Sequence, residues 1–250
     1  MVVNPKTVLI TGGGRRIGAA IARDLAARGW VVVIHCRESR READELAASL
    51  GEGRGFVVQA DLASEADVGT VIERATALAG PVTALINNAS RFVFDSAASV
   101  SGEAVRAHMA PNLIAPLILA RDFAAALGDH KGVIVNILDQ KLHNLNPDFF
   151  SYTLSKAALA AATEMLAMAL APRIRVCGVS PGLTLIGHKQ TPASFERGWK
   201  SMPLEQGSPP EDIARTVAFI LETGSITGTT LVVDGGEHLM RRVRDVAFSV

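Results

Sequence analysis

The sequence predicts an α/β protein built on a parallel sheet, and three observations lead to this class. Short runs rich in Val and Ile alternate with Ala- and Leu-rich stretches that carry charges at helical spacing. The apolar runs scarcely alternate with polar residues, as expected of strands buried on both faces. A glycine cluster follows the first run, where a strand would turn into a helix. Alternating strands and helices imply right-handed crossovers and a parallel sheet.

Seven segments are predicted to be strands, and the clearest helices lie between the first four of them. The strands are expected at 7–12, 31–36, 55–62, 84–89, 132–138, 174–182 and 230–236, and the helices at 17–28, 40–50 and 65–79. The least regular stretch, 183–208, is rich in Gly, Pro and Ser and contains Phe195 and Trp199. It is either a lid over a substrate or a plain surface connection.

Composition excludes several classes of protein. Lys plus Arg and Asp plus Glu both number 25, so the formal net charge is zero and a nucleic-acid partner is not expected. Cys36 and Cys177 lie in apolar runs without a CxxC pair, which predicts neither a disulfide framework nor a metal site. The chain opens directly into a strand, without a secretory leader, and no uncharged, glycine-free apolar run reaches transmembrane length. We expect a cytoplasmic protein with no membrane partner.

The segment "LITGGGRRIGAAIA" predicts a phosphate-binding turn. Gly12, Gly14 and Gly18 would let the backbone turn tightly and approach a pyrophosphate, and the following helix would begin at the same point. The alternative is a simple turn. Arg15 and Arg16 lie within this turn, and Arg37 follows the second strand.

An NAD site usually has Asp or Glu at the end of that second strand, whereas arginine suits a 2′-phosphate. The sequence therefore favours NADPH, unless these arginines are solvated surface residues. Asp61 after the third strand and Asn88 after the fourth would line the same crevice, and Asp61 could equally cap a turn or helix. The further residues expected at the cofactor are Ile17, His35, Leu62, Ala89, Ser90, Lys156, Pro181 and Gly182.

Tyr152 and Lys156 form the predicted reaction centre. They are four residues apart in a helical stretch, so both face the same way. The lysine charge should favour the phenolate and lower the tyrosine pKa, which would make Tyr152 a general acid for a carbonyl oxygen or imine nitrogen that receives hydride. Tyr152 is the only tyrosine of the chain. The alternative is a structural tyrosine beside a surface lysine.

From end to end the chain resembles the short-chain dehydrogenase/reductase family. The motifs that carry the resemblance are "TGGGRRIG", "NNAS", "YTLSK", "SPG" at 180–182 and "TGTTLVVDGG" at 227–236. The resemblance implies one Rossmann-type doubly wound domain over residues 1–250, with a seven-stranded parallel sheet flanked by helices, a nicotinamide cofactor and a homotetramer. It also implies that Tyr152 donates the proton, that Lys156 binds the nicotinamide ribose, and that Asn112 supports a proton-relay water.

Two positions depart from the family pattern. Arg16 replaces the middle glycine of TGxxxGxG, and Asp139 replaces the catalytic serine thirteen residues before the tyrosine. Both departures are similar to those of the pteridine reductases and the bacterial dihydromonapterin/dihydrofolate reductases, which "NNASRF" also resembles. That resemblance implies a pterin site formed by Arg16, Ser90, Phe92, Asp139, Tyr152 and Leu183.

A carboxylate at 139 could accept hydrogen bonds from pterin nitrogens, pass on a proton, or orient Tyr152. Phe92 offers a flat apolar face to a flat heterocycle. Their alternatives are a turn cap and a core residue. Three functions follow: an NADPH-dependent dihydropterin reductase acting on dihydromonapterin, dihydrobiopterin or dihydrofolate, a broad carbonyl or 3-oxoacyl reductase, and a non-catalytic NADPH-binding regulator.

Overall fold

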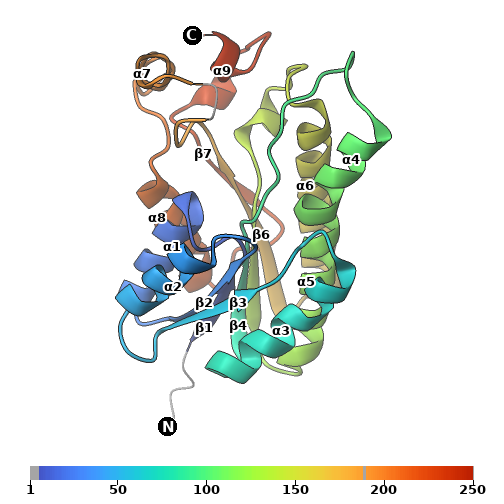
Figure 1. Cartoon of the computed structure of the whole chain (residues 1–250), viewed down its shortest axis with the longest axis vertical. Helices are drawn as coiled ribbons and strands as arrows, with labels where there is room; N and C mark the ends of the chain where they lie inside the picture. Colours follow the sequence, from blue (N-terminus) through green and yellow to red (C-terminus); the bar gives the residue numbers. More distant parts are fainter. Residues whose placement is uncertain (1–5, 188–189, 250) are drawn as a thin grey trace.

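The computed structural model describes residues 6–187 and 190–249, and it confirms the predicted fold class (Figure 1). Seven strands form one sheet, and each neighbouring pair is parallel. Their order across the sheet is β3-β2-β1-β4-β5-β6-β7. The strands are β1 (Thr7–Ile10), β2 (Val31–Cys36), β3 (Gly55–Gln59), β4 (Val82–Asn87), β5 (Gly132–Ile137), β6 (Ile174–Pro181) and β7 (Thr230–Val233).

Helices cover both faces of the sheet, as Figure 1 shows. One face carries α1 (Arg16–Ala27), α2 (Arg40–Ser49) and α8 (Pro210–Glu222), and the other carries α3 (Glu65–Ala79), α5 (Ala115–Leu127) and α6 (Phe150–Leu170). The helix α4 (Gly102–Met109) continues through a π-helical turn, η1 (Ala110–Ile114), into α5. The remaining elements are η2 (Gln140–His143), α7 (Pro192–Lys200), η3 (Glu237–Leu239) and α9 (Val246–Ser249).

Successive strand residues supply two different cores. Ile10, Ile34 and Ile86 pack with the helices of the first face, whereas Leu9 and Leu85 pack with those of the second. Because side chains alternate across a sheet, a strand that is covered on both sides must be apolar at every position. This requirement explains why the strand sequences do not alternate.

Two buried asparagines join the central strands β4 and β5. Asn87 and Asn136 are register partners, and the Asn87 Nδ2 donates to the Asn136 Oδ1 at 2.8 Å. The Asn136 Nδ2 in turn donates to the Thr163 Oγ1 on α6 at 2.9 Å. This chain of side chains ties the sheet to the helix that carries Tyr152 and Lys156.

The strand order reverses between β1 and β4, and ligands of open α/β sheets bind outside the carboxyl ends of strands at such a point. The glycine turn follows β1, and the "NNAS" segment begins at the end of β4. Both predicted halves of the site therefore meet at one edge of the sheet.

The stretch 183–208 is more regular than its composition predicts. It contains α7, which Thr191 caps by accepting from the Ser194 N–H at 3.1 Å, while the Ser194 hydroxyl returns to the capping residue. Pro192 occupies the first turn, where its missing N–H costs nothing. Residues 188 and 189 of the predicted lid lie outside the described residues.

Candidate active site

The glycine turn is shaped by close backbone approach. Gly12 has a φ of +60°, a left-handed conformation that favours glycine. A Cβ on Gly18 would lie 2.3 Å from the Gly12 carbonyl oxygen, and one on Gly13 would lie 2.9 Å from that of Ile10. The first backbone N–H groups of α1 have no acceptor within the described residues. Such a turn suits a pyrophosphate, which fits the predicted cofactor.

Arg16 adopts a left-handed backbone, with a φ of +53°. This conformation is the reason that a glycine would fit the position, and a larger residue there costs about 1 kcal/mol or more. The Arg16 guanidinium reaches across to the Ile186 carbonyl at 3.3 Å, so it spans from the nucleotide turn to the segment 183–208. Arg15 pairs with Glu42 of α2, and Arg37 pairs with its neighbour Glu38 at 2.9 Å.

The side chains of His35 and Asn88 form hydrogen bonds with the backbone of the glycine turn. The His35 Nδ1 accepts from the Gly12 N–H at 3.1 Å, and its Nε2 lies 3.1 Å from the Ala60 carbonyl. Burial lowers the pKa of His35 to about 4, so the ring is neutral and Nε2 carries the proton. The Asn88 Nδ2 donates to the carbonyls of Thr11 and Gly12 at 2.9 and 3.1 Å. Both side chains therefore hold the cradle in shape, with their polar atoms turned into the protein.

The other predicted cofactor residues gather at the same edge. Asp61 follows β3 and accepts from the Ala63 N–H at 2.9 Å, which is the turn-capping role allowed by the sequence. Gly182 follows β6, and its N–H donates to the Ser208 Oγ at 3.1 Å. The Leu183 N–H donates to the buried Glu237 Oε2 at 3.1 Å. Ile17 and Ala89 are partly exposed at these turns, whereas Leu62 and Pro181 are buried.

Asn112 is fully buried in the π-helical turn. Its Oδ1 accepts from the Arg91 N–H at 2.7 Å, and its Nδ2 donates to the Arg91 carbonyl at 3.0 Å and to the Ser155 Oγ at 2.9 Å. The Ser90 hydroxyl lies 3.3 Å from the same Oδ1. The Asn112 side chain thus clamps the segment after β4 onto α6, and a water relay through this amide remains a prediction.

Tyr152 and Asp139 form a hydrogen-bonded pair. The Tyr152 hydroxyl donates to the Asp139 Oδ2 at 2.7 Å, while the Asp139 Oδ1 accepts from the Lys141 N–H at 2.9 Å. One carboxylate therefore caps η2 and orients the phenol. Lys156 lies one helical turn on, with its Nζ donating to the Ile137 carbonyl at 2.7 Å and 5.9 Å from the centre of the Tyr152 ring.

The protonation states differ from the expectation. Burial, together with the Asp139 carboxylate, raises the pKa of Tyr152 well above its ordinary value. The predicted lowering by Lys156 is wrong in this structure, because burial and the Asp139 carboxylate determine the direction of the Tyr152 shift. Burial also lowers the pKa of Lys156 to about 8, so its side chain is still mostly protonated at neutral pH. Burial raises the pKa of Asp139 as well, against the opposing hydrogen bonds from Tyr152 and Lys141. The site is therefore equipped to hold protons.

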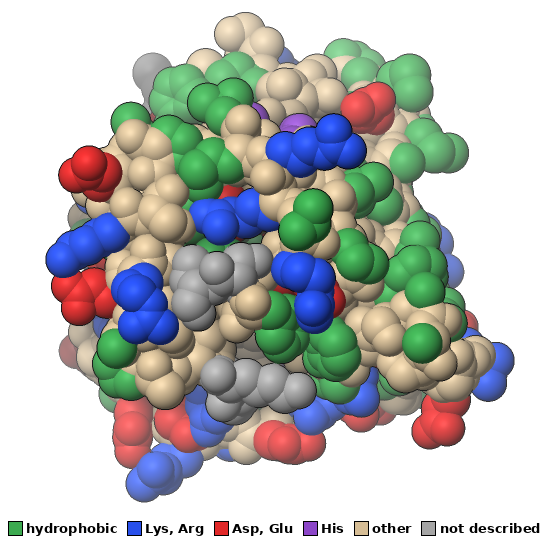
Figure 2. Space-filling view, turned by 90° about the horizontal axis from the view of Figure 1, so that it is seen from above, with side chains coloured by type: hydrophobic (Ala, Val, Ile, Leu, Met, Phe, Trp, Pro, Cys, Tyr) green, Lys and Arg blue, Asp and Glu red, His purple; other side chains and the backbone are tan. Residues whose placement is uncertain are grey.

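An aromatic wall stands beside the pair. Phe92 is 52% exposed, and its ring stacks on Phe149 at 4.2 Å and meets Tyr152 edge-on at 4.6 Å. Phe149 has a left-handed φ of +55° at the N-cap of α6. Phe92 is therefore accessible from solvent, and the stacking of a flat ligand on its ring stays a prediction. Figure 2 views this end of the molecule and shows basic side chains across the middle of the face.

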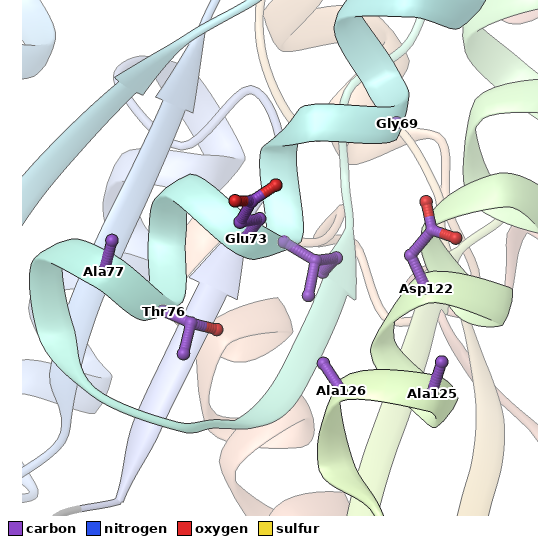
Figure 3. A pocket seen from close by; sticks show the side chains of 8 residues that line it. Gly69, Glu73, Thr76, Ala77, Asp122, Ala125 and Ala126 are labelled. Atoms are coloured by element: carbon purple, nitrogen blue, oxygen red, sulfur yellow. The ribbon is translucent and has the colours of Figure 1, made fainter.

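A second hollow lies away from these residues. A groove of about 560 Å³ lies between α3 and α5. Figure 3 shows Glu73 on α3 and Asp122 on α5, with the small side chains of Ala125 and Ala126 nearby. None of the predicted site residues lines it. The groove gives no support to a function of its own.

The residues from 13 to 238 match the family model described as Enoyl-(Acyl carrier protein) reductase. The chain belongs to the short-chain dehydrogenase/reductase family. The family expectation is thereby confirmed, and the roles of Tyr152, Lys156 and the glycine turn stay predictions.

Solved structures and curated relatives of this short-chain dehydrogenase/reductase point to a subgroup. The FolM alternative dihydrofolate reductase 1 from Brucella suis, in complex with NADP, is 45% identical with a TM-score of 0.91, over 97% of this chain and 98% of that one. Pteridine reductase 1 of Leishmania tarentolae is 32% identical over 93% of this chain and 96% of the relative. A putative ketoacyl reductase of the granaticin polyketide synthase from Streptomyces violaceoruber is 30% identical over 93% and 96%.

Sequence reasoning missed three parts of this reductase's site. Glu237 is 3% exposed and anchors Leu183, and burial raises its pKa to about 7. Phe149 backs the ring of Phe92. The segment 240–249 lies over the loop after β5. Of these, only the aromatic pair "FF" at 149–150, just before the helix of Tyr152, gave a local signal.

Proposed function

We propose that this chain is an NADPH-dependent reductase of a dihydropterin, of the dihydromonapterin, dihydrobiopterin or dihydrofolate class. The observation that carries the proposal is the 2.7 Å hydrogen bond from Tyr152 to Asp139, beside the exposed ring of Phe92. A relative named pteridine reductase and a neighbour named alternative dihydrofolate reductase, with NADP bound, support the substrate class and cofactor. Residues 1–250 would form a single NADP(H)-binding domain.

NADPH fits the residues at the switch point. The glycine turn and the free N–H groups at the start of α1 would receive the pyrophosphate. Arg15, Arg16 and Arg37 would supply positive charge for the 2′-phosphate, in place of the acid that selects NAD. When bound, the cofactor supplies the hydride. The turn's supporting side chains keep that pocket in shape whether or not a ligand is present.

The protein's own part is to supply the proton. Tyr152 stays protonated across the neutral range because its pKa is raised, and its hydroxyl points at Asp139. Asp139 can return a proton to the phenolate after transfer, because its pKa is raised too. Lys156 places a positive charge below the ring, where it would stabilise the phenolate as it forms and hold the nicotinamide ribose.

A broad carbonyl or 3-oxoacyl reductase is the second candidate. Its support is the 30% identity to a putative ketoacyl reductase, together with the retained Tyr152 and Lys156. It gives no role to Asp139 or Phe92. A non-catalytic NADPH-binding regulator is weaker, because it would need neither the reactive pair nor the aromatic wall.

The test follows NADPH absorbance with the purified protein and separate dihydropterins, dihydrofolate and small ketones. We expect oxidation with a dihydropterin or dihydrofolate, at a kcat/KM at least about 10-fold above any ketone. Turnover of ketones alone would overturn the substrate class and retain the family. NADPH binding without any turnover would support the regulator.

We also propose that the enzyme is a cytoplasmic homotetramer. Two helical stretches, Gly102–Leu127 and Phe150–Leu170, are apolar and long enough to span a membrane by length and composition. Leu117, Met165 and Met168 on these helices are exposed. Large exposed apolar patches mark interaction sites, and a partner subunit would cover this one. Light scattering without detergent tests the assembly, and Met165→Lys with Met168→Lys should yield smaller species.

The cytoplasmic location rests on Cys36 and Cys177. Both thiols are free and buried, as suits a reducing compartment. Fractionation of the cells that produce the protein would test this location.

A further inference from the structure

The loop that joins β5 to α6 carries residues of the active site at both ends. Asp139 begins it, and Phe149 ends it at the N-cap of α6. Between them lie η2 and a turn that contains Asn146 and Asp148. The position of Asp139 relative to Tyr152 therefore depends on what holds this loop in place.

The C-terminal segment, residues 240–249, holds the loop through charges. The Lys141 Nζ is bonded to the Asp245 Oδ2 at 2.9 Å and to the Asn146 Oδ1 at 2.5 Å. Arg244 forks onto both oxygens of Asp148 at 2.8 to 3.0 Å, and the Asp245 N–H adds a 2.8 Å bond to the Asp148 Oδ2. Burial would raise the pKa of Asp148, but these bonds outweigh it and lower that pKa.

The same segment extends the aromatic wall. Phe248 stacks on Phe149 at 5.9 Å with an interplanar angle of 27°, and meets Phe94 at 5.2 Å. Phe149 in turn stacks on Phe92, whose ring touches Tyr152. A continuous row of rings therefore runs from the C-terminal segment to the catalytic tyrosine.

A third contact joins the segment to the opposite wall of the site. The Arg242 Nη2 donates to the Ser201 Oγ at 2.8 Å, at the C-cap of α7. The segment thus bridges the loop after β5 and the stretch 183–208. Figure 1 shows α9 and α7 at the same end of the molecule, above the strand ends.

We propose that the C-terminal segment is a positioning element of the active site, in which Asp245 holds Lys141, the residue whose N–H donates to Asp139, and Phe248 supports the aromatic wall through Phe149. Its role in substrate reduction rests on the proposed function. The mechanism is a direct one: the segment fixes the loop by ion pairs, and its carboxylate places a negative charge near Asp139 and Tyr152.

Several charged groups surround the pair. Lys156 lies on α6, Lys141 on η2, Glu237 on η3, and Arg242 and Asp245 on the C-terminal segment. Asp245 raises the pKa of Asp139, whereas Lys156 lowers it. Removing the Asp245 charge also leaves the Lys141 ammonium without its ion pair. Both effects lower the proton affinity of Asp139.

The first test uses the single tyrosine as a reporter. Protein labelled with tyrosine carrying ¹³C at Cζ gives one resonance, and its pH titration follows the Asp139 carboxyl through the hydrogen bond from Tyr152. In Asp245→Asn we expect the midpoint to fall by about 0.5 to 1 pH unit, the effect of one nearby like charge. An unmoved or raised midpoint would overturn the electrostatic part of the proposal.

This readout needs no substrate, so it stands even if the wild type reduces a ketone and the proposed function fails. If Asp245→Asn does not fold, Arg244→Gln replaces it as the test of loop positioning. We expect Arg244→Gln to leave the midpoint of the Tyr152 titration unchanged and to weaken NADPH-dependent turnover. Unchanged turnover in folded Arg244→Gln would count against the proposal. Arg28→Gln is the control, because Arg28 also forms surface ion pairs, with Asp24 and Glu222, but these link α1 to α8.

The second test separates the wall from the charge. We expect Phe248→Ala to raise KM for the reduced substrate about 3- to 10-fold while kcat and the Tyr152 midpoint stay within about 2-fold and 0.2 pH unit. Unchanged KM would overturn the role of Phe248. A parallel fall in kcat with a shifted midpoint would also overturn it, because the ring would then act on the proton pair.

Discussion

The cofactor side and the substrate side of the site are built from different parts of the chain. On the cofactor side, the side chains of His35 and Asn88 form hydrogen bonds with the backbone of one turn. The glycines of that turn allow its backbone segments to approach one another closely. On the substrate side, Tyr152 and Asp139 bond to each other through side chains. The pyrophosphate of the cofactor would meet backbone N–H groups, and the substrate would meet side chains.

Substitutions on the two sides should therefore affect different properties of the enzyme. A change on the cofactor side distorts the cradle, so it should appear as lost stability and weaker NADPH binding. A change on the substrate side leaves the backbone intact, so it should appear in turnover. Five substitutions test whether the two sides differ in this way.

Tyr152→Phe is expected to have the largest effect. It removes the proton donor but keeps the ring, so kcat should fall about 10³- to 10⁴-fold, the upper range for a general acid. NADPH affinity, measured by fluorescence titration, should change less than about 3-fold. A comparable loss of NADPH affinity would break the division between the two sides.

Gly18→Ala should break the cradle. The new Cβ would lie 2.3 Å from the Gly12 carbonyl, so the turn must shift, with a loss of about 2 to 4 kcal/mol in unfolding free energy. Urea unfolding and NADPH titration would measure both effects. Gly69→Ala is the control, because a Cβ there meets nothing within 4 Å and should stabilise α3 by about 0.5 to 1 kcal/mol.

His35 should make the cofactor side sensitive to acid. Its pKa is about 4 in the folded protein and 6.5 when exposed, so the unfolded chain binds the proton more tightly between these values. Stability should therefore be lost as pH falls from 6.5 to 4, by about 3 kcal/mol at most. Unfolding free energies of His35→Gln should depend less on pH in this window. His130→Gln, at an exposed position, should follow the wild type.

Asp139→Asn should affect turnover and stability in opposite ways. Loss of the proton-holding group should lower kcat about 10²-fold while NADPH binding persists. Since the folded protein raises this pKa, the wild type loses stability from Asp139 as pH rises above 3.8. The stability of the variant relative to wild type should therefore increase with pH, as urea unfolding at several pH values would show. Unchanged turnover would remove Asp139 from the mechanism.

Arg16→Gly should have the smallest effect on stability. It relieves the left-handed strain but gives the unfolded chain more freedom, so the two terms should cancel to within about 1 kcal/mol. The KM for NADPH should nevertheless rise about 10-fold, because a phosphate-binding guanidinium is lost. A large gain in stability with unchanged KM would show that Arg16 is only a strained surface residue.

The sequence predicted the strands and helices better than the side-chain contacts of the site. The strand positions could be predicted from apolar runs, because a strand that is buried on both faces is apolar at nearly every residue. The Tyr152–Lys156 pair followed from helical spacing. The direction of the Tyr152 pKa shift did not follow, because it depends on burial and on the 2.7 Å contact to Asp139.

The C-terminal segment was equally hidden. Its run "RRVRD" at 241–245 matches no motif, yet Arg244 pairs with Asp148, which lies 96 positions earlier. Nothing local in the sequence records such a pairing. Helix α7 could have been found, because "TPAS" at 191–194 carries both a capping threonine and an early proline.

The paired amides of Asn87 and Asn136 have a consequence for how the chain finds its fold. Parallel strands meet late, after long loops have closed, and apolar strands of similar sequence can join one residue out of step. A slip of one residue between β4 and β5 would turn one amide to the opposite face and leave two polar groups buried without partners. The two amides therefore destabilise misaligned pairings of β4 and β5 and favour the native register, in which the glycine turn and the helix of Tyr152 are brought together.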